Sequence, residues 1–319
     1  MKTETHSFYS EGIRLAGLVH LPDDIQPGER RSAMLICSGG QGLKEWVPAR
    51  WWPYFVAAGY VCMAFDYRGF GTSEGERGQM FPQREAQDVR AAVAFLQQHP
   101  SVDPHSIGAV GWGMGGAVVI EAAAYDDSIS SVCCAAGFGW GARAHRDNCS
   151  LQAWIDRQDE LAQDRVRRAV DGKSKMVPWY QALTPGRSEN PMTRPSNQFR
   201  KDISALGQKP VPELSLATCE AIYDFRPELL AARISPRPLL VVHGTRDRLY
   251  HPDEARSIYD HALEPKTLMW IEGGDHLDWI QPDSPLSKPG IGRVVGWFVE
   301  QMPPYPIAVT HVPAAMFAR

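Results

Sequence analysis

The most restrictive feature of this 319-residue sequence is a repeated order of short apolar runs and amphipathic stretches. Short apolar runs bounded by turn residues are typical of strands buried in a parallel sheet, and apolar residues at helical spacing indicate helices that pack on it. Alternation of the two predicts an α/β fold, a mostly parallel sheet with helices on both faces. The expected buried strands are 33–37, 60–67, 106–112, 128–137, 237–244 and 266–273, the expected helices are 47–58, 84–99, 114–125, 252–263 and 289–301, and two earlier strands are expected at 5–9 and 12–20.

The alternation stops near residue 140. Residues 142–208 contain no buried-strand pattern, carry more Lys and Arg than Asp and Glu, and include one clear helical stretch at 150–172. An insertion that leaves the sheet at this point of the chain is expected to lie over it. We therefore predict a core domain from 1–140 and 209–303, a helical cap insertion at 141–208 and a C-terminal tail at 304–319.

The sequence GWGMGG at 111–116 joins an expected strand to an expected helix. Glycines two positions before and after a central residue let a strand turn sharply into a helix, as in the nucleophile elbow G-x-S-x-G. Gly113 stands at the central position, where the pattern has Ser, and the N–H of Met114 is expected to face the same point. Gly111, Gly113 and Gly116 also match the dinucleotide pattern G-x-G-x-x-G. We disfavour that alternative, because the motif follows the third buried strand and no acidic residue stands at a strand end about 20 positions later.

Three loops at the ends of expected strands carry the remaining parts of a triad site. Asp247 follows the strand 237–244, and His276 follows the strand 266–273. The chain order of elbow, acid and histidine resembles that of α/β hydrolases. Both residues lie just after the C-terminal ends of expected strands, where open α/β sheets place their sites. The loop SGGQG at 38–42 follows the first parallel strand, where a second oxyanion-hole N–H is expected. Its candidate donors are Gly39, Gly40 and Gln41.

Five segments together carry a resemblance to a known superfamily: CSGGQGLKEW (37–46), DYRGFGTSEG (66–75), GWGMGG (111–116), YDFRPELLAARISPRPLLVVHGTRD (223–247) and GGDHLDW (273–279). Over about 300 residues the chain resembles α/β-hydrolase-fold proteins, and among them the dienelactone-hydrolase-like and Xaa-Pro-dipeptidyl-peptidase-like esterases and acyl hydrolases. The resemblance implies Asp247 as the acid, His276 as the base, and Met114 with the 39–41 loop as the oxyanion hole. It also implies Ser at position 113, and this chain departs from it there.

Gly113 has no side chain, so the acyl-enzyme route through this position is closed. Cys37 and Ser38 lie at the mouth of the neighbouring strand, whose direction sets their backbone, and we do not expect either to replace a Ser. Three interpretations follow. The chain is an ester, thioester or other acyl hydrolase inactivated by the loss of Ser; or it is a Ser-less enzyme whose Asp247–His276 pair acts as a general base for water attack, C–C cleavage, lyase or cyclisation chemistry; or it is a non-catalytic ligand-binding protein.

The aromatic content of the insertion and its flank favours a cyclic or aromatic small-molecule substrate. The net charge of −4 and pI near 6.2 give no reason to expect nucleic acid or membrane as a partner. The sequence shows no secretory signal, which favours the cytoplasm, and it indicates no metal, flavin, nicotinamide or other cofactor. It leaves a homo-oligomer open. The candidate substrate-binding residues are Trp140, Trp154, Trp179 and Tyr180.

Overall fold

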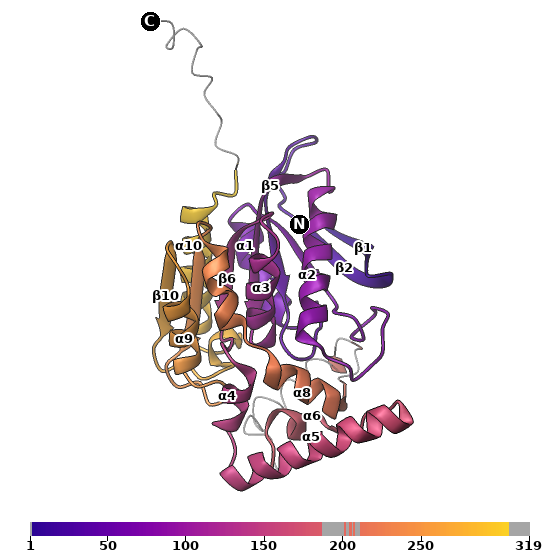
Figure 1. The fold of residues 1–319 in the computed structure, drawn as a ribbon. Coiled ribbons are helices and arrows are strands. Elements are labelled where there is room, and N and C mark those ends of the chain that lie inside the picture. Colours follow the sequence, from indigo (N-terminus) through magenta and orange to yellow (C-terminus); the bar gives the residue numbers. More distant parts are fainter. Residues whose placement is uncertain (1, 187–200, 202–203, 206, 208–210, 306–319) are drawn as a thin grey trace, which may run out of the picture.

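The centre of the molecule is an eight-stranded sheet with the strand order β1-β2-β4-β3-β5-β6-β9-β10 (Figure 1). The computed structural model describes residues 2–186 and 211–305, together with residues 201, 204, 205 and 207. The pairings β1–β2 and β2–β4, which lie toward one edge of the sheet, are antiparallel, and all the others are parallel, which confirms the predicted mostly parallel sheet. The strands are β1 (Lys2–Ser10), β2 (Ile13–Leu21), β3 (Arg31–Cys37), β4 (Val61–Phe65), β5 (Val102–Trp112), β6 (Ile129–Ala135), β9 (Leu239–Gly244) and β10 (Lys266–Ile271).

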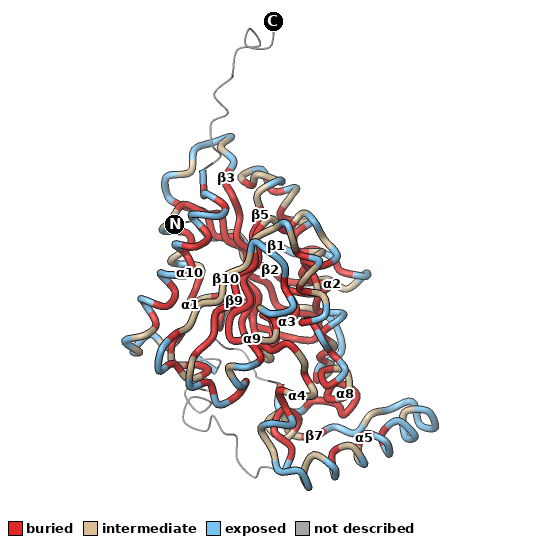
Figure 2. The backbone as a smooth tube through the Cα atoms, turned by 60° about the vertical axis from the view of Figure 1, so that its left-hand side comes forward, coloured by how far each residue is buried: buried red, intermediate tan, exposed pale blue. Residues whose placement is uncertain are grey.

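Helices cover both faces of this sheet (Figures 1 and 2). On one face α1 contacts α10, and on the other α2 contacts α3, while the 3-10 helix η1 (Pro227–Ile234) contacts both α3 and α9. Because helices cover the sheet on both sides, β3, β4 and β9 are buried along their whole length, as their continuous apolar runs predict (Figure 2). The helices of the core are α1 (Val47–Ala57), α2 (Pro82–Gln97), α3 (Met114–Ala124), α9 (Asp253–His261) and α10 (Ser287–Gln301).

A second layer of elements follows β6 and lies at the end of the sheet that carries the loops after β3, β5 and β9 (Figure 1). Its longest helix, α5 (Leu151–Asp171), matches the expected helix, begins at an N-cap hydrogen bond from the Ala153 N–H to Ser150 and ends at Gly172, whose φ is +71°. The other elements are α4 (Gly141–Arg146), β7 (Met176–Pro178), α6 (Trp179–Leu183), β8 (Glu213–Ser215) and α8 (Leu216–Asp224).

The described part of this layer extends beyond residue 208. The three-residue strands β7 and β8 pair antiparallel, and α8 contacts both α4 and α5. The layer therefore draws on both sides of the expected boundary, and the division at 208 stays a prediction. Residues 187–200 of the expected cap and 306–319 of the expected tail lie outside the described residues. Within the described ranges no helix is long and apolar enough to cross a membrane.

Candidate active site

The turn from β5 into α3 is an elbow that only glycine permits at several positions. A Cβ atom added at Gly111 would lie 2.0 Å from the carbonyl oxygen of Gly115, and one added at Gly115 would lie 2.2 Å from the carbonyl oxygen of Ser38. Both distances are far inside van der Waals contact, so these glycines let β5, α3 and the loop after β3 approach one another closely. The backbone at Gly113 has φ 57° and ψ −119°, a conformation that residues with a side chain rarely adopt.

Gly113 itself faces open space and His276. A Cβ atom at this position would have its nearest neighbour, Nε2 of His276, at 3.5 Å, which is an ordinary van der Waals distance. The Gly113 N–H donates to the carbonyl oxygen of Ala135 at 2.8 Å, which fixes the elbow to β6. The structure therefore places the central residue of the elbow next to the ring of His276, and the catalytic roles of these two positions stay a prediction.

Asp247 and His276 form a hydrogen-bonded pair at the ends of β9 and β10. Nδ1 of His276 lies 2.8 Å from Oδ2 of Asp247, while Oδ1 accepts from the backbone N–H groups of Leu249 and Tyr250, each at 2.8 Å. A carboxylate only accepts, so Nδ1 carries the proton and Nε2 of the neutral ring carries a lone pair. Nε2 hydrogen-bonds to none of the described residues and faces Gly113.

The surroundings of Asp247 keep it ionised. Burial raises the pKa of its carboxyl, but the electrostatic interaction with the neighbouring His276 and the hydrogen bonds that the carboxylate accepts outweigh burial, so the net pKa is lowered. Nε2 of His243 lies 3.3 Å from Oδ2 and 2.9 Å from the carbonyl oxygen of Tyr250. An ionised, rigidly held Asp247 stabilises a His276 that gains a proton, which is what a general base requires.

Residues from two elements line the cavity beside Gly113 and carry backbone N–H groups. Met114 is the first residue of α3, and Gly39, Gly40 and Gln41 follow β3. These four N–H groups donate to none of the residues that the structure describes, so they are candidates for holding an oxyanion.

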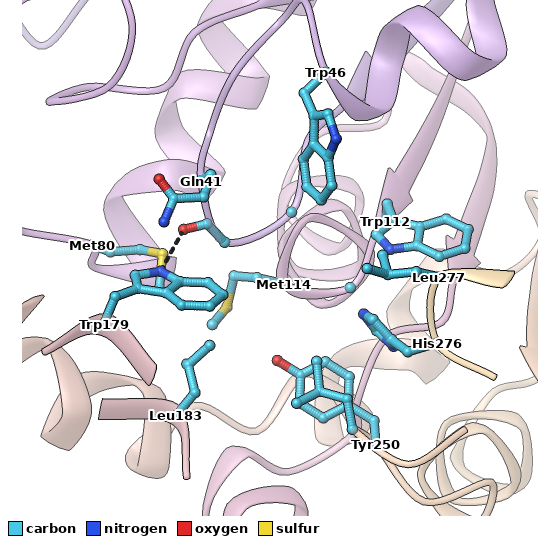
Figure 3. A pocket seen from close by; sticks show the side chains of 14 residues that line it. Gln41, Trp46, Met80, Trp112, Met114, Trp179, Leu183, Tyr250, His276 and Leu277 are labelled. Carbon is cyan, nitrogen blue, oxygen red and sulfur yellow. Dashed lines mark hydrogen bonds between the residues drawn. The ribbon is translucent and has the colours of Figure 1, made fainter. Parts of the chain in front are cut away.

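The loop after β3 is tied to the layer above it. The amide of Gln41 pairs with the backbone of Val211, because Oε1 accepts from the Val211 N–H at 2.9 Å and Nε2 donates to its carbonyl oxygen at 3.4 Å. The indole N–H of Trp179 donates to the carbonyl oxygen of Gly40 at 3.4 Å (Figure 3). The candidate donors are therefore positioned by hydrogen bonds to the Val211 backbone and the Trp179 side chain as well as by β3.

A cavity opens in front of Gly113 and His276 (Figure 3). It contains about 570 Å³ of space not filled by atoms, part of it open to solvent. Most of the side chains that line it are apolar or aromatic, so it suits an uncharged organic group better than an ionic one. The lining residues are Gly39, Gly40, Gln41, Trp46, Met80, Trp112, Gly113, Met114, Trp179, Leu183, Leu249, Tyr250, His276 and Leu277.

Of the four candidate substrate-binding aromatics, the structure brings Trp179 to this cavity. Trp140 packs against the Arg226 guanidinium, 4.4 Å from its ring centre, and donates to the carbonyl oxygen of Tyr223. Trp154 packs on the ring of Tyr223, and the hydroxyl of Tyr180 accepts from the amide of Gln181 at 3.2 Å. These three residues are not among the lining residues, and a substrate role for them stays a prediction.

Several lining residues were not singled out from the sequence: Met80, Trp112, Leu183, Leu249, Tyr250 and Leu277. Leu249 and Tyr250 carried a detectable signal, since they lie two and three positions after Asp247 and their N–H groups hold its carboxylate. Leu277 likewise follows His276 directly. Met80 and Leu183 come from loops and short helices whose placement depends on tertiary packing.

Neither Cys37 nor Ser38 lines the cavity, although both lie at the end of β3. Burial raises the pKa of the Cys37 thiol to about 12, so the nucleophilic thiolate does not form at neutral pH. The Ser38 hydroxyl is buried. The structure therefore offers no replacement nucleophile at either position.

One cluster of potential metal ligands lies elsewhere, on β1 and after α2. Oε2 of Glu4 lies 3.2 Å from Nε2 of both His6 and His99. The Ser101 N–H donates to Nδ1 of His99, so the neutral His99 ring carries its proton on Nε2 and donates it to Glu4. The lone pair on Nδ1 of His99 accepts the Ser101 N–H, and Nε2 carries the proton, so this ring has no free lone pair for a metal. The contacts therefore fit a hydrogen-bonded cluster.

The parallel sheet, the elbow, the acid–histidine pair and the loop after β3 together define an α/β-hydrolase fold. The chain belongs to the serine aminopeptidase S33 family, whose model matches residues 28–283.

The chain is also similar to individual proteins over most of its length. The chain is 26% identical over 302 residues to protein PA2218 of Pseudomonas aeruginosa, covering 91% of this chain and 78% of that protein. It is 25% identical over 279 residues to the polyketide transferase ATR5 of Stachybotrys chlorohalonatus, covering 85% and 88%. The crystal structure of the α/β hydrolase GrgF from Penicillium superposes with a TM-score of 0.76 at 21% identity, covering 95% of this chain and 99% of that one.

Proposed function

We propose that this protein cleaves an acyl substrate, an ester or thioester, with His276 acting as a general base on water. The observation that carries the proposal is the intact pair in which Asp247 holds Nδ1 of His276 at 2.8 Å while Nε2 faces Gly113. A water molecule held between Nε2 and the substrate carbonyl takes the place that a Ser hydroxyl has in the elbow pattern. General-base catalysis of this kind contributes roughly 10²–10⁴ in rate.

The proton and bond changes balance without a covalent intermediate. Water attacks the carbonyl carbon and gives a proton to Nε2 of His276, while the oxyanion accepts hydrogen bonds from the N–H of Met114 and one of the N–H groups at 39–41. The intermediate then expels the alkoxide or thiolate, which takes the proton from the imidazolium. The products are a carboxylic acid and an alcohol or thiol. The same base serves C–C cleavage, lyase or cyclisation chemistry, and product analysis distinguishes these from hydrolysis.

The apolar cavity supports an uncharged acyl group as the part of the substrate that binds there, and its three indole rings support a cyclic or aromatic one. The resemblance to dienelactone-hydrolase-like esterases and the names of the transferase relatives support acyl chemistry in general. We propose no metal, flavin or nicotinamide as a participant.

A second candidate is a Ser hydrolase whose nucleophile has been lost. The 3.5 Å between a Cβ at position 113 and Nε2 of His276 favours it, since a hydroxyl on that carbon would reach the histidine. In this case the chain as it stands binds acyl substrates and turns them over very slowly.

Three variants separate these functions: Gly113→Ser, Gly113→Ala and His276→Ala. Each is assayed on a panel of short aryl esters and thioesters. Our proposal expects turnover by the unaltered protein that His276→Ala lowers by about 10²–10⁴. The second candidate expects little turnover until Gly113→Ser raises it by orders of magnitude, with Gly113→Ala as the control for the added Cβ. Tight ligand binding with turnover in none of the forms identifies a binding protein and contradicts both.

A further inference from the structure

Tyr250 brings a phenol into a cavity with few polar side chains. Its ring is held edge-on to the rings of His276 and Phe138, with centroid distances of 5.3 Å and 5.0 Å. Its N–H binds Asp247, and its carbonyl oxygen accepts from His243. The backbone and the ring of Tyr250 are therefore both held in place, and its hydroxyl points toward the middle of the cavity (Figure 3).

The Tyr250 hydroxyl is available to a ligand, as is Nε2 of His276, whereas the polar groups of Gln41, Trp179 and Trp112 are not. The Gln41 amide is engaged by Val211, the Trp179 indole N–H is engaged by Gly40, and the indole nitrogen of Trp112 is fully covered. The hydroxyl of Tyr250 forms no hydrogen bond with the residues that the structure describes, although the residue is only 3% exposed. Tyr250 lines the cavity, so a ligand atom in the cavity can reach this hydroxyl.

The phenol is neutral in this environment. Burial raises the pKa of Tyr250, and the negative charges of Asp247 and Glu254 raise it further. At neutral pH the hydroxyl keeps its proton and offers it as a hydrogen-bond donor. A ligand oxygen is the matching acceptor.

We propose that Tyr250 is a specificity-determining residue whose hydroxyl donates a hydrogen bond to a carbonyl or hydroxyl oxygen of the acyl group. Because its ring packs against His276, that oxygen lies within a few bonds of the carbonyl that reacts. The substrate class is then an acyl ester or thioester oxygenated near its reacting end. This inference rests on the proposed acyl-cleaving function and names the substrate class of the same site.

The first experiment compares two thioesters of N-acetylcysteamine, 3-oxooctanoyl and octanoyl, on the unaltered protein and on Tyr250→Phe. We expect the protein to prefer the 3-oxo substrate. Tyr250→Phe should lower kcat/KM for it by about 10- to 100-fold, as expected for one lost hydrogen bond that leaves an acceptor buried, and change the octanoyl value by less than about twofold. An equal loss on both substrates, or no loss on either, overturns the proposal.

A binding measurement keeps the test independent of turnover. Calorimetry on the His276→Ala background uses the 3-oxooctyl and octyl thioethers of N-acetylcysteamine, which have no cleavable carbonyl. We expect Tyr250→Phe to weaken only the 3-oxo compound. If His276→Ala turns over thioesters as fast as the unaltered protein, the proposed function is wrong, and this binding difference still reports on Tyr250. Equal affinities with and without the phenol refute its role.

Tyr67→Phe is the matched control, because it removes a buried phenol that does not line the cavity. It should leave the ratio of the two kcat/KM values unchanged. Thermal unfolding of both variants checks that each is folded. A change of selectivity in Tyr67→Phe as large as that in Tyr250→Phe would show that packing, not a hydrogen bond to substrate, sets the preference.

Discussion

A Cβ atom on Gly113 would lie 3.5 Å from Nε2 of His276 and meet no backbone atom within 4 Å. The elbow thus has room for a side chain at its central residue, although its backbone conformation, with φ 57°, disfavours one. The free space permits a side chain at this position, while the backbone strain lowers the stability of a protein that carries one.

The strain predicts that Gly113→Ala destabilises the fold. We expect the free energy of unfolding to fall by about 1–3 kcal/mol, the usual cost of placing a side chain in a sparsely populated backbone region. Urea denaturation measures it. Gly28→Ala, at φ 83° in a loop with no neighbour within 4 Å, should cost a similar amount without involving the site. An unchanged or increased stability of Gly113→Ala contradicts the strain.

Close approach predicts a larger effect at Gly115. Its added Cβ would lie 2.2 Å from the carbonyl oxygen of Ser38, so Gly115→Ala forces α3 away from the loop after β3. We expect a loss of more than about 3 kcal/mol, or failure to fold. Gly292→Ala, in α10 with nothing within 4 Å, should instead stabilise by about 0.5–1 kcal/mol. Chemical denaturation of the two variants shows whether their effects differ in sign.

Asp247→Asn should abolish most of the activity while leaving the protein folded. The amide keeps the size of the carboxyl group but loses the charge, and it can hold His276 in the wrong tautomer. We expect kcat/KM to fall by roughly 10²–10⁴, measured on whichever ester proves the best substrate. Asp253→Asn, an exposed acid on α9, is the control and should change it by less than about twofold. Full activity in Asp247→Asn would show that His276 is not the base.

The buried carboxyl group of Glu85 should make the free energy of unfolding depend on pH. This α2 residue is buried, and burial, together with the charge of Asp88, raises its pKa to about 8. The unfolded chain releases the same proton near pH 4.3, a pKa typical of an unperturbed glutamic acid. Its contribution to stability is therefore complete below about pH 4.3 and is lost as the pH rises to about 8.

Glu85→Gln removes this titration. We expect the unaltered protein to lose stability between pH 5 and pH 8 more steeply than the variant, as measured by guanidinium unfolding at both values. Parallel losses in the two proteins would mean that Glu85 is already ionised in the fold.

Trp179→Ala should weaken substrate binding. Trp179 lines the cavity and donates to Gly40, so its removal enlarges the acyl site and frees the loop after β3. We expect KM to rise about tenfold, because the substrate keeps its other contacts and loses only part of the few kcal/mol that contact with a buried indole ring supplies. Trp140→Ala, which removes an indole outside the cavity, should leave KM within about twofold. A larger effect at Trp140 would return that residue to the list of substrate contacts.

The core of the fold could be predicted from the sequence because each of its signals is local. A parallel strand buried on both faces appears in the sequence as an uninterrupted apolar run, and Gly111 of the elbow reflects a backbone contact with Gly115, four residues later. Asp247 and His276 could be located because each lies a few residues after the end of a buried strand, β9 and β10.

The covering layer could not be predicted to the same degree. The three-residue strands β7 and β8 are too short to show a period, and they pair across about 35 intervening residues. The composition of the insertion does not predict which aromatic side chains face the cavity. Trp140, Trp154 and Trp179 are the same residue type, and only their tertiary partners differ. Tyr250 was overlooked because its sequence neighbours identify the acid and not the phenol.

The room beside Gly113 also has an evolutionary meaning. The elbow is shaped by Gly111 and Gly115, whose substitution the packing forbids, while position 113 accepts a Cβ at the cost of backbone strain alone. In the genetic code a single base separates two of the four glycine codons, GGU and GGC, from codons of serine and of cysteine. Under the proposed mechanism, one point mutation in such a codon for residue 113 would therefore exchange water-based for covalent chemistry and leave the rest of the catalytic apparatus in place.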